Sequence, residues 1–381
     1  MKVRLGDYIQ EYSVRNKAEE GIPVYSVTNT QGFCQDYFGK EVASKDKSTY
    51  KIVPKGYFAY NPSRINVGSV DWQRVEDRVI VSPLYNVFSV SSRLDQQYLY
   101  YYLKSDFALQ RIRDVATGSV RDNLKLEMLY EFPIELPEID QQKSITKLLD
   151  TVKHIIDLWT KELQALDDLI KARFVEMFGD PEFNTKAWPI QLLDKLCNVG
   201  SSKRIYQNEQ SNEGVPFWRI SDLVSKMDTG IADSGLYIPE EKYSELKKSG
   251  LVPVSGDILV TSRGTLGRCY IVKDDDRFYF QDGMISWLSD YSESITPLYL
   301  QYLFMMPGFR KQIDNMQAGS TVAYFSIAML KRLQVMVPGK DAQEEFTKFV
   351  AQIDKSKAAV QKALAKTQML FNSLMQEYFG R

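Results

Sequence analysis

Two arginines occupy the same place in two related loops of the sequence. Arg64 lies in the segment SRINVG, residues 63–68, and Arg263 lies in SRGTLG, residues 262–267. Each loop follows a run typical of a β-strand, so each arginine is expected at an exposed turn. There, a guanidinium can donate two hydrogen bonds to O6 and N7 of guanine, a pair that contributes about 1–3 kcal/mol of discrimination. The alternative is an ion pair with a carboxylate of the same domain, while the glycine makes the turn.

A Gly-Ser segment follows each loop. The first copy is GSVRDNLK, residues 118–125, and the second is GSTVAYFS, residues 319–326. Small donors and cations of this kind contact phosphates, which position a protein on a duplex without specifying its sequence. The candidate contact residues here are Ser119, Arg121, Lys125, Ser320 and Tyr324.

The second half of the chain carries further basic residues near its loop. They are Lys203 and Arg204 in the run SSKR, the nearby Arg219, and Arg268 directly after the loop glycine. We include all four as candidate DNA contacts. A charge run of this type is also compatible with a solvated surface that binds nothing.

These candidate residues belong to a chain that repeats itself. Pro137, Gln142 and Phe178 recur 201 positions later as Pro338, Gln343 and Phe379, and the match continues upstream at the same offset from Tyr98 onward. Earlier still the register slips, since IPVYSVTN at residues 22–29 corresponds to VPFWRISD at residues 215–222. A long period that occurs twice indicates two duplicated domains whose first halves have diverged most.

The repeated segment predicts a long helix in each copy. Apolar residues spaced alternately by four and three form a heptad seam. Apart from Gly339, which directly follows the opening proline of the second copy, neither segment contains Gly or Pro between its opening proline and its closing Phe-Gly. Each helix can therefore span roughly 38 residues, or about 57 Å. The seam residues are Ile145, Leu149, Val152, Ile156, Trp159, Leu163, Leu166 and Ile170 in the first copy, and Phe346, Val350, Ile353, Val360, Leu364 and Phe371 in the second.

The two helices are expected to pair with each other in an antiparallel arrangement. The alternative is that each helix packs on its own globular module. The predicted domains are residues 1–136, a helix over 137–180, a second domain over 181–337 and a second helix over 338–381. Within the domains, strands are expected at residues 56–60, 78–82 and 256–260, followed by helical stretches over 96–115 and 297–316.

Composition bounds the class of protein. The 381 residues are 44% hydrophobic and 25% charged, with a net charge of −1 and a pI near 6.1, so a nucleic-acid contact would depend on local patches. No run of about 18 apolar residues predicts a membrane span, and the first residues do not resemble a signal peptide. The three cysteines, Cys34, Cys197 and Cys269, are expected to be buried thiols in a reducing compartment, which together indicates a cytoplasmic protein.

No catalytic constellation is evident. The segment YNPS at residues 60–63 matches a base-gripping methyltransferase strip only in part, and no glycine-rich loop for a methyl donor lies near it. The segment GTLGR at residues 264–268 is too short for a nucleotide phosphate loop. The single histidine, His154, lies within the first long helix. We expect no catalytic residue, no metal site and no cofactor.

The order of these features, twice in one chain, resembles the specificity subunit of type I restriction-modification systems. The resemblance rests on a Leu-x-Asp opening (LGD at 5–7, LLD at 192–194), a Pro-aromatic strand, a Gly-Ser turn, and a heptad helix that ends in Phe-Gly. The resemblance implies an α+β chain with two mixed α/β target-recognition domains, separated by two long antiparallel coiled-coil helices and internally pseudo-twofold. It also implies three partners: double-stranded DNA with a bipartite site, methyltransferase (M) subunits and a restriction (R) subunit.

Two other readings stay open. In the first, the chain is a coiled-coil protein scaffold without DNA recognition. In the second, it belongs to a fused restriction enzyme whose catalytic portion has been lost or lies on another chain. Apolar residues beyond the seam, such as Leu148, Ile155 and Phe349, are expected to be exposed and favour partner docking on the helices.

Overall fold

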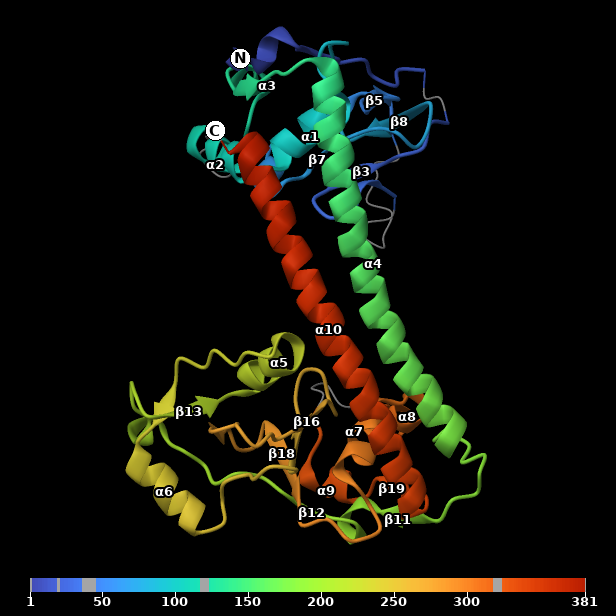
Figure 1. The fold of residues 1–381 in the computed structure, drawn as a ribbon, viewed down its shortest axis with the longest axis vertical. Coiled ribbons are helices and arrows are strands. Elements are labelled where there is room, and N and C mark those ends of the chain that lie inside the picture. The colour runs from blue at the N-terminus through green and yellow to red at the C-terminus, as the bar shows by residue number, and fades with distance from the viewer. Residues whose placement is uncertain (1, 19–20, 36–45, 117–122, 318–323, 381) are drawn as a thin grey trace. The chain divides into compact units, whose positions relative to one another are not determined.

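The computed structural model divides the chain into two compact units, each of which is described by itself. Unit 1 comprises Met1–Lys161 and Val360–Arg381, and unit 2 comprises Glu162–Ala359. The structure describes residues 2–18, 21–35, 46–116, 123–317 and 324–380. Both unit boundaries fall inside the two long helices, α4 (Ile139–Phe178) and α10 (Lys340–Phe379), so each unit holds part of both helices (Figure 1).

The scaffold lobe of unit 1 is built on an antiparallel sheet with the strand order β2-β9-β6-β7. Its strands are β2 (Ile9–Glu11), β9 (Asn86–Val90), β6 (Phe58–Tyr60) and β7 (Val70–Trp72). A second ribbon and three short helices complete it: β1 (Lys2–Arg4) paired with β10 (Pro133–Glu135), α1 (Gln96–Lys104), α2 (Asp106–Val115) and α3 (Leu126–Tyr130). The rings of Phe58 on β6 and Phe88 on β9 stack at 5.1 Å in the core between sheet and helices, because residues directly opposite each other on neighbouring strands face the same side.

Among its described residues, the variable lobe of unit 1 contains strands but no helix. A hairpin joins β3 (Ser26–Thr28) to β4 (Gly32–Cys34), and β5 (Lys51–Pro54) pairs with β8 (Arg78–Val81). Val27, Val53 and Val81 are buried in a small core of their own. Val79 and Val81, from the strand predicted at residues 78–82, thus belong to this separate cluster rather than to the scaffold core.

Unit 2 repeats the scaffold lobe element by element. Its sheet has the order β12-β18-β15-β16, with β12 (Asn198–Gly200), β18 (Ile285–Ser289), β15 (Ile258–Thr261) and β16 (Cys269–Ile271). The ribbon is β11 (Ile190–Leu192) with β19 (Gln334–Met336), and the helices are α7 (Pro297–Met305), α8 (Pro307–Met316) and α9 (Ile327–Lys331). The same strand order twice confirms the duplication that the sequence indicated.

The variable lobe of unit 2 differs from that of unit 1. Its three-stranded sheet places β13 (Val215–Trp218) between β14 (Tyr237–Ile238) and β17 (Tyr279–Phe280), the latter in parallel. Two helices that unit 1 lacks among its described residues, α5 (Ile220–Thr229) and α6 (Glu240–Lys248), belong to it. The slipping sequence register in the first half of each copy therefore reflects different local structures.

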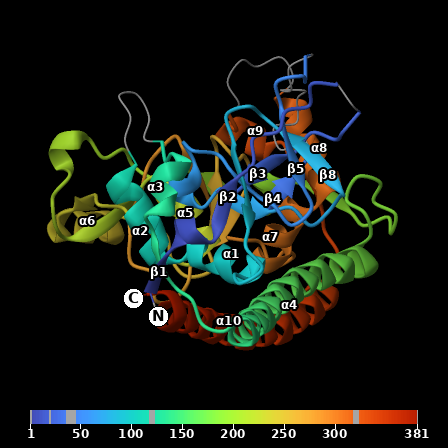
Figure 2. The same cartoon turned by 90° about the horizontal axis from the view of Figure 1, so that it is seen from above.

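Both long helices form as the heptad pattern predicted. Within each unit the segments of α4 and α10 lie side by side in both views (Figures 1 and 2). In unit 2, Lys357 pairs with Asp167 at 2.6 Å and Glu345 with Arg173 at 2.7 Å. Residue numbers therefore rise along α4 in the direction in which they fall along α10. The helices are therefore antiparallel there.

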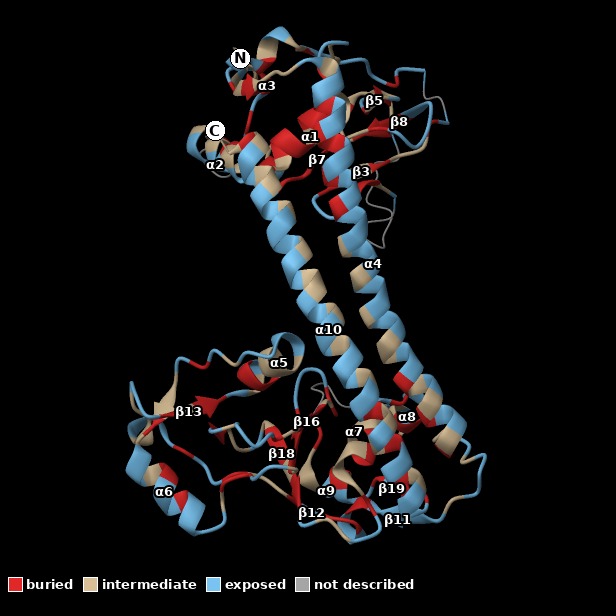
Figure 3. Cartoon of the chain, in the orientation of Figure 1, coloured by how far each residue is buried: buried red, intermediate tan, exposed pale blue. Residues whose placement is uncertain are grey.

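The predicted seam faces inward in both units. None of its residues, which all lie in the described part of the chain, is exposed. Ile145, Leu149, Val152, Ile170, Phe346 and Val350 are buried, and Ile156, Trp159, Leu163, Leu166, Ile353, Val360, Leu364 and Phe371 are partly buried. Exposed residues, coloured pale blue, alternate with buried and intermediate ones along both helices (Figure 3).

Two buried glutamines fix the start of each long helix to its scaffold lobe. Gln142 and Gln343 each accept a backbone N–H at 2.8 Å and donate to two backbone carbonyls at 2.8–3.0 Å. The partners are Asp95, Arg93 and Pro137 for Gln142, and Thr296, Ser294 and Pro338 for Gln343. Residues 201 positions apart thus have the same environment.

Three expectations need correction. Each predicted helical stretch is two helices: an extended Ser105, whose hydroxyl caps α2, interrupts the first, and Met306 before Pro307 interrupts the second. Phe349 is not exposed, because it packs on the core of unit 2 beneath the guanidinium of Arg173. Cys34 is only partly buried, unlike Cys197 and Cys269.

Candidate nucleic-acid interface

The Ser-Arg loop of unit 1 leaves the end of β6 and forms a short 3-10 turn, η2 (Ile65–Val67). The Asn61 side chain holds the loop, because its Oδ1 accepts hydrogen bonds from the backbone N–H of Ser63 at 3.1 Å and from its hydroxyl at 3.0 Å. Gly68 ends the turn with φ +86°, a left-handed conformation that favours glycine. The glycine makes the turn as predicted, and Arg64 is left exposed at the start of η2.

The matching loop of unit 2 follows β15. Gly267 has φ +71°, and a Cβ added there would lie 2.7 Å from Cδ1 of Ile313. Arg263 is exposed, and its guanidinium carbon lies 5.3 Å from the centre of the Tyr324 ring, a distance typical of a cation–π contact. The backbones of Arg263 and Tyr324 also form an isolated β-bridge. Two residues predicted separately therefore meet.

The segment after each Gly-Ser turn returns to the Ser-Arg loop. In unit 1 the N–H of Leu124 donates to the carbonyl of Pro62 at 3.1 Å, and in unit 2 the N–H of Phe325 donates to the carbonyl of Ser262 at 2.9 Å. Lys125 is exposed next to this contact. The candidates Ser119, Arg121 and Ser320 lie outside the described residues.

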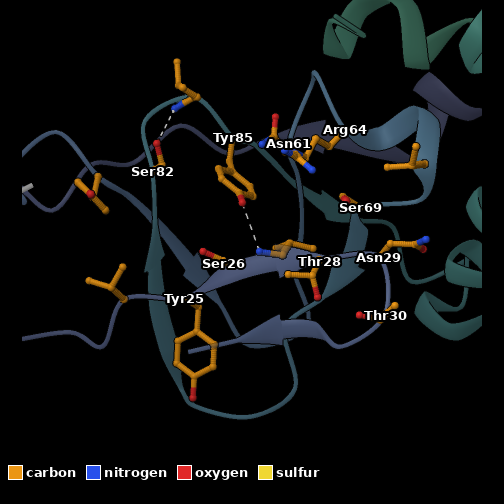
Figure 4. A pocket seen from close by; sticks show the side chains of 15 residues that line it. Tyr25, Ser26, Thr28, Asn29, Thr30, Asn61, Arg64, Ser69, Ser82 and Tyr85 are labelled. Atoms are coloured by element: carbon orange, nitrogen blue, oxygen red, sulfur yellow. Dashed lines mark hydrogen bonds between the residues drawn. The ribbon is translucent and has the colours of Figure 1, made fainter. Parts of the chain in front are cut away.

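A hollow of about 450 Å³, here called hollow 1, lies beside the loop of unit 1. Its wall combines β3, the segment after β8 and the Ser-Arg loop, and Arg64 and Asn61 lie next to each other in it (Figure 4). The N–H of Val27 donates to the Tyr85 hydroxyl at 3.4 Å across this wall. Most other lining groups are hydroxyls and amides, from Tyr25, Ser26, Thr28, Asn29, Thr30, Tyr50, Ser69 and Ser82. Within the described part of the chain, Arg64 has no carboxylate partner.

A side groove of about 370 Å³ borders hollow 1 and shares Asn61 and Leu84 with it. Lys125 lines this groove together with Asn123 and Asn86, and Glu11 and Glu127 line it as well. Arg64 and Lys125 therefore stand on the two sides of Asn61. The structure brings together a guanidinium and an ammonium that the sequence had placed in separate motifs.

Hollow 2 is the corresponding space in unit 2, with a volume of about 470 Å³. It collects three of the predicted residues, Arg204, Arg263 and Tyr324. Arg204 is held by Asp282, whose Oδ2 lies 2.9 Å from the guanidinium Nε. The remaining lining residues include Ile205, Gln210, Phe217, Gln281, Gly283 and Met284.

The two hollows correspond through the internal repeat. Each lies between the Pro-aromatic strand of its copy, represented by Val24 or Phe217, and the Ser-Arg loop. Their linings differ, since hollow 1 is rich in hydroxyl groups whereas hollow 2 offers two glutamines and a second arginine. One scaffold thus presents two different sets of hydrogen-bonding groups.

The other basic candidates of unit 2, all of them described, do not line either hollow. Arg219 lies 3.5 Å from Asp222 at the start of α5, and Arg268 forms an ion pair with Asp228. Lys203 is exposed and anchored by its backbone, whose N–H donates to the Tyr279 hydroxyl at 2.8 Å. Arg204, Arg219 and Arg268 each pair with a carboxylate of their own domain. Such a pair was the alternative for the loop arginines, but Arg64 and Arg263 form none among the described residues.

A buried carboxylate stabilises the wall of hollow 1. Asp71 accepts the N–H of Phe33 at 3.3 Å and pairs with Arg74 at 3.0 Å, which ties the β3–β4 hairpin to β7. Burial raises the pKa of the Asp71 carboxyl, while the nearby Arg74 and the backbone donors act in the opposite direction. The hairpin that carries Thr28 and Asn29 is therefore fixed from behind.

The arrangement suits the binding of a ligand by hydrogen bonds rather than the making or breaking of covalent bonds. Guanidinium, amide and hydroxyl groups at an open hollow can hydrogen-bond base edges or phosphates. Among the described residues, no group of three or more His, Cys, Asp or Glu side chains is placed to hold a metal ion, and no described helix has the length and apolarity to cross a membrane. Sequence reasoning missed Gln210, Gln281 and Tyr85, which no motif marks in the sequence.

Comparison with known proteins agrees with this picture. A family model described as the type I restriction modification DNA specificity domain matches twice, over residues 5–168 and 186–367. The type I restriction enzyme MjaVIII specificity subunit of Methanocaldococcus jannaschii is 23% identical, over 72% of this chain and 68% of its own length. A type I specificity-subunit relative in Haemophilus influenzae is also 23% identical, over 66% of this chain but only 63% of its own length. The crystal structure of the type I S subunit from M. genitalium shares the fold, with a TM-score of 0.54 and 15% identity over all of this chain and 96% of that one.

Proposed function

The chain belongs to the type I restriction-modification DNA specificity family, and on this premise we propose that it is the DNA sequence-recognition subunit of a type I restriction-modification complex. It binds a bipartite site on double-stranded DNA, and each unit reads one half-site. Hollow 1 and hollow 2 are the reading surfaces. Arg64 and Arg263 are the residues that grip base edges.

One observation carries this proposal: the duplicated scaffold holds an exposed arginine beside a hollow at the same place in both units, while the linings differ. Repetition of the scaffold supports one mode of DNA approach. Different donors and acceptors favour different bases, because the major groove presents a distinct pattern for each base pair. The two half-sites are therefore unlike, and the complete site is asymmetric.

The chain itself carries out no reaction in this proposal. Methylation and cleavage belong to separate M and R subunits that assemble on it. The exposed Leu148 and Ile155 on α4 offer these partners an apolar surface. The net charge of −1 fits such an assembly, since partner subunits then supply much of the phosphate neutralisation. A role on cellular DNA places the chain in the cytoplasm.

The test is a map of methylated adenines, obtained by single-molecule sequencing of host cells with and without the gene for this chain. Loss of one bipartite asymmetric motif on deletion is the expected result. An unchanged map, with the companion methyltransferase shown to be expressed, would contradict it and favour the protein scaffold without DNA recognition.

A further inference from the structure

Three cations surround one tyrosine ring in unit 1. The guanidinium carbon of Arg74 and the ammonium nitrogens of Lys104 and Lys153 lie 5.9, 5.5 and 5.7 Å from the centre of the Tyr100 ring. They come from the segment after β7, from α1 and from α4, respectively. We call these four residues the Tyr100 cluster. Lys153 and Arg74 are exposed, so an incoming group can reach the cluster from solvent.

Among the described residues, the charges of the cluster are not fully neutralised. Asp71 is committed to Arg74 and to the backbone of the hairpin, and Asp150 accepts the Tyr101 hydroxyl at 2.5 Å and the Gln97 amide at 2.9 Å. Three cations thus face two carboxylates that already have donors. Burial, with the nearby charge of Lys153, lowers the pKa of Lys104 to about 8 against the pull of Asp71. An anion that approached would relieve the repulsion between the cations.

The cluster is connected to hollow 1. Lys104 Nζ donates to the backbone carbonyl of Asn29 at 2.9 Å and to its Oδ1 at 3.2 Å, and Asn29 lines hollow 1. A polymer with regularly spaced anions that is seated at hollow 1 would therefore pass close to the cluster. DNA is such a polymer.

The corresponding place in unit 2 lacks most of these charges. At the offset of 201, Tyr100, Lys104 and Lys153 become Gln301, Met305 and Asp354. Only Lys273, which follows β16 as Arg74 follows β7, keeps a positive charge. The scaffold does not need the cluster, since the sheet and helices form without it.

We propose that the Tyr100 cluster is a phosphate-contact site for DNA backbone next to the half-site of unit 1, and that unit 2 has no equivalent. This inference rests on the proposed function, because it assumes that a duplex occupies hollow 1. The two half-sites are then held unequally: unit 1 contributes sequence-independent affinity that unit 2 does not.

The test measures binding of a fluorescent duplex of mixed sequence to the full chain, assembled with its M subunits, across a series of salt concentrations. The variants are Lys104→Gln and Lys153→Gln. Each lost phosphate contact is expected to reduce the slope of log affinity against log salt by about 0.9. Lys143→Gln, an exposed lysine earlier on α4, is the matched control and should leave the slope unchanged.

Charge-conserving variants separate a phosphate contact from a structural effect. Lys104→Arg and Lys153→Arg are expected to keep the slope, and a loss equal to that of the Gln variants would overturn the proposal. An unchanged slope in both Gln variants would also overturn it, and weaker assembly with the M subunits would then identify an acidic protein surface as the partner. If the unmodified complex shows no preference for the methylated motif over mixed sequence, the proposed function fails instead.

Discussion

The scaffold lobes of the two units are near copies, whereas their variable lobes are built differently. Sheet order, helix order and even single side-chain hydrogen bonds recur at the offset of 201 in the scaffold. The variable lobe is a set of paired strands in unit 1 and a mixed sheet with two helices in unit 2. After duplication, the parts that hold the long helices have kept their contacts, and the parts that surround the hollows have changed. Paired substitutions at equivalent positions can test this division.

The largest expected effect concerns the buried glutamines. Gln142→Leu and Gln343→Leu each leave one backbone N–H and two carbonyls without a partner in a buried site, and each should lower the free energy of unfolding by roughly 2–5 kcal/mol. Denaturant titration of the two variants measures this loss. The exposed Gln141→Leu and Gln352→Leu are controls on the same helices and should change little. A large difference between the two glutamine variants would show that the scaffold lobes are not equivalent.

The two loop arginines should affect base discrimination rather than stability. The loss should be similar for both variants, but it should fall on a different half-site in each. Arg64→Ala and Arg263→Ala are each expected to cost about 1–3 kcal/mol of base discrimination, in different halves of the methylated motif. Methylation mapping of cells that carry either variant reads this out directly. Arg268→Ala, at an arginine already paired with Asp228, is the control and should leave both half-sites intact. If both loop variants relaxed the same half of the methylated motif, the assignment of one half-site to each unit would be wrong.

A smaller effect is expected at two buried tyrosines of the scaffold. Tyr98 donates its hydroxyl to the carbonyl of Glu135 and Tyr299 to that of Met336, both at 3.0 Å. Tyr98→Phe and Tyr299→Phe each remove one donor and should cost about 1 kcal/mol of stability. Thermal or denaturant unfolding can compare them, and Tyr206→Phe at an exposed site serves as the control. Unequal losses of stability would show that these two hydrogen bonds do not contribute equally to the two scaffold lobes.

The same division explains what the sequence could predict. The heptad seam, the loop glycines and the duplication depend on local spacing, and the structure has the helices, turns and repeated sheet that they indicate. The break at Ser105 was missed because a serine inside an apolar pattern does not reveal that its hydroxyl caps a new helix. The variable lobe of unit 2 could not be foreseen, since β13 pairs with β17 across about sixty residues and no repeat guides that pairing. Hollow 2 draws its wall from such distant segments, so Gln210 and Gln281 had no signal in the sequence.

The last expected effect is a pH dependence at Lys104, a position that Met305 occupies in unit 2. Lys104 has its pKa lowered from 10.5 to about 8 in the folded chain, mainly by burial, while Asp71 raises it and Lys153 lowers it further. Below pH 8 the lysine is charged in both the folded and the unfolded chain, so its desolvation opposes folding in full. Between pH 8 and 10.5 the unfolded chain binds more protons, and the stability contributed by this site should rise with pH. The unfolding midpoint of the unmodified chain, relative to that of Lys104→Met, which copies Met305 of unit 2, should therefore rise across this range. Parallel curves would mean that Lys104 is not held in the dehydrated setting that distinguishes the two units.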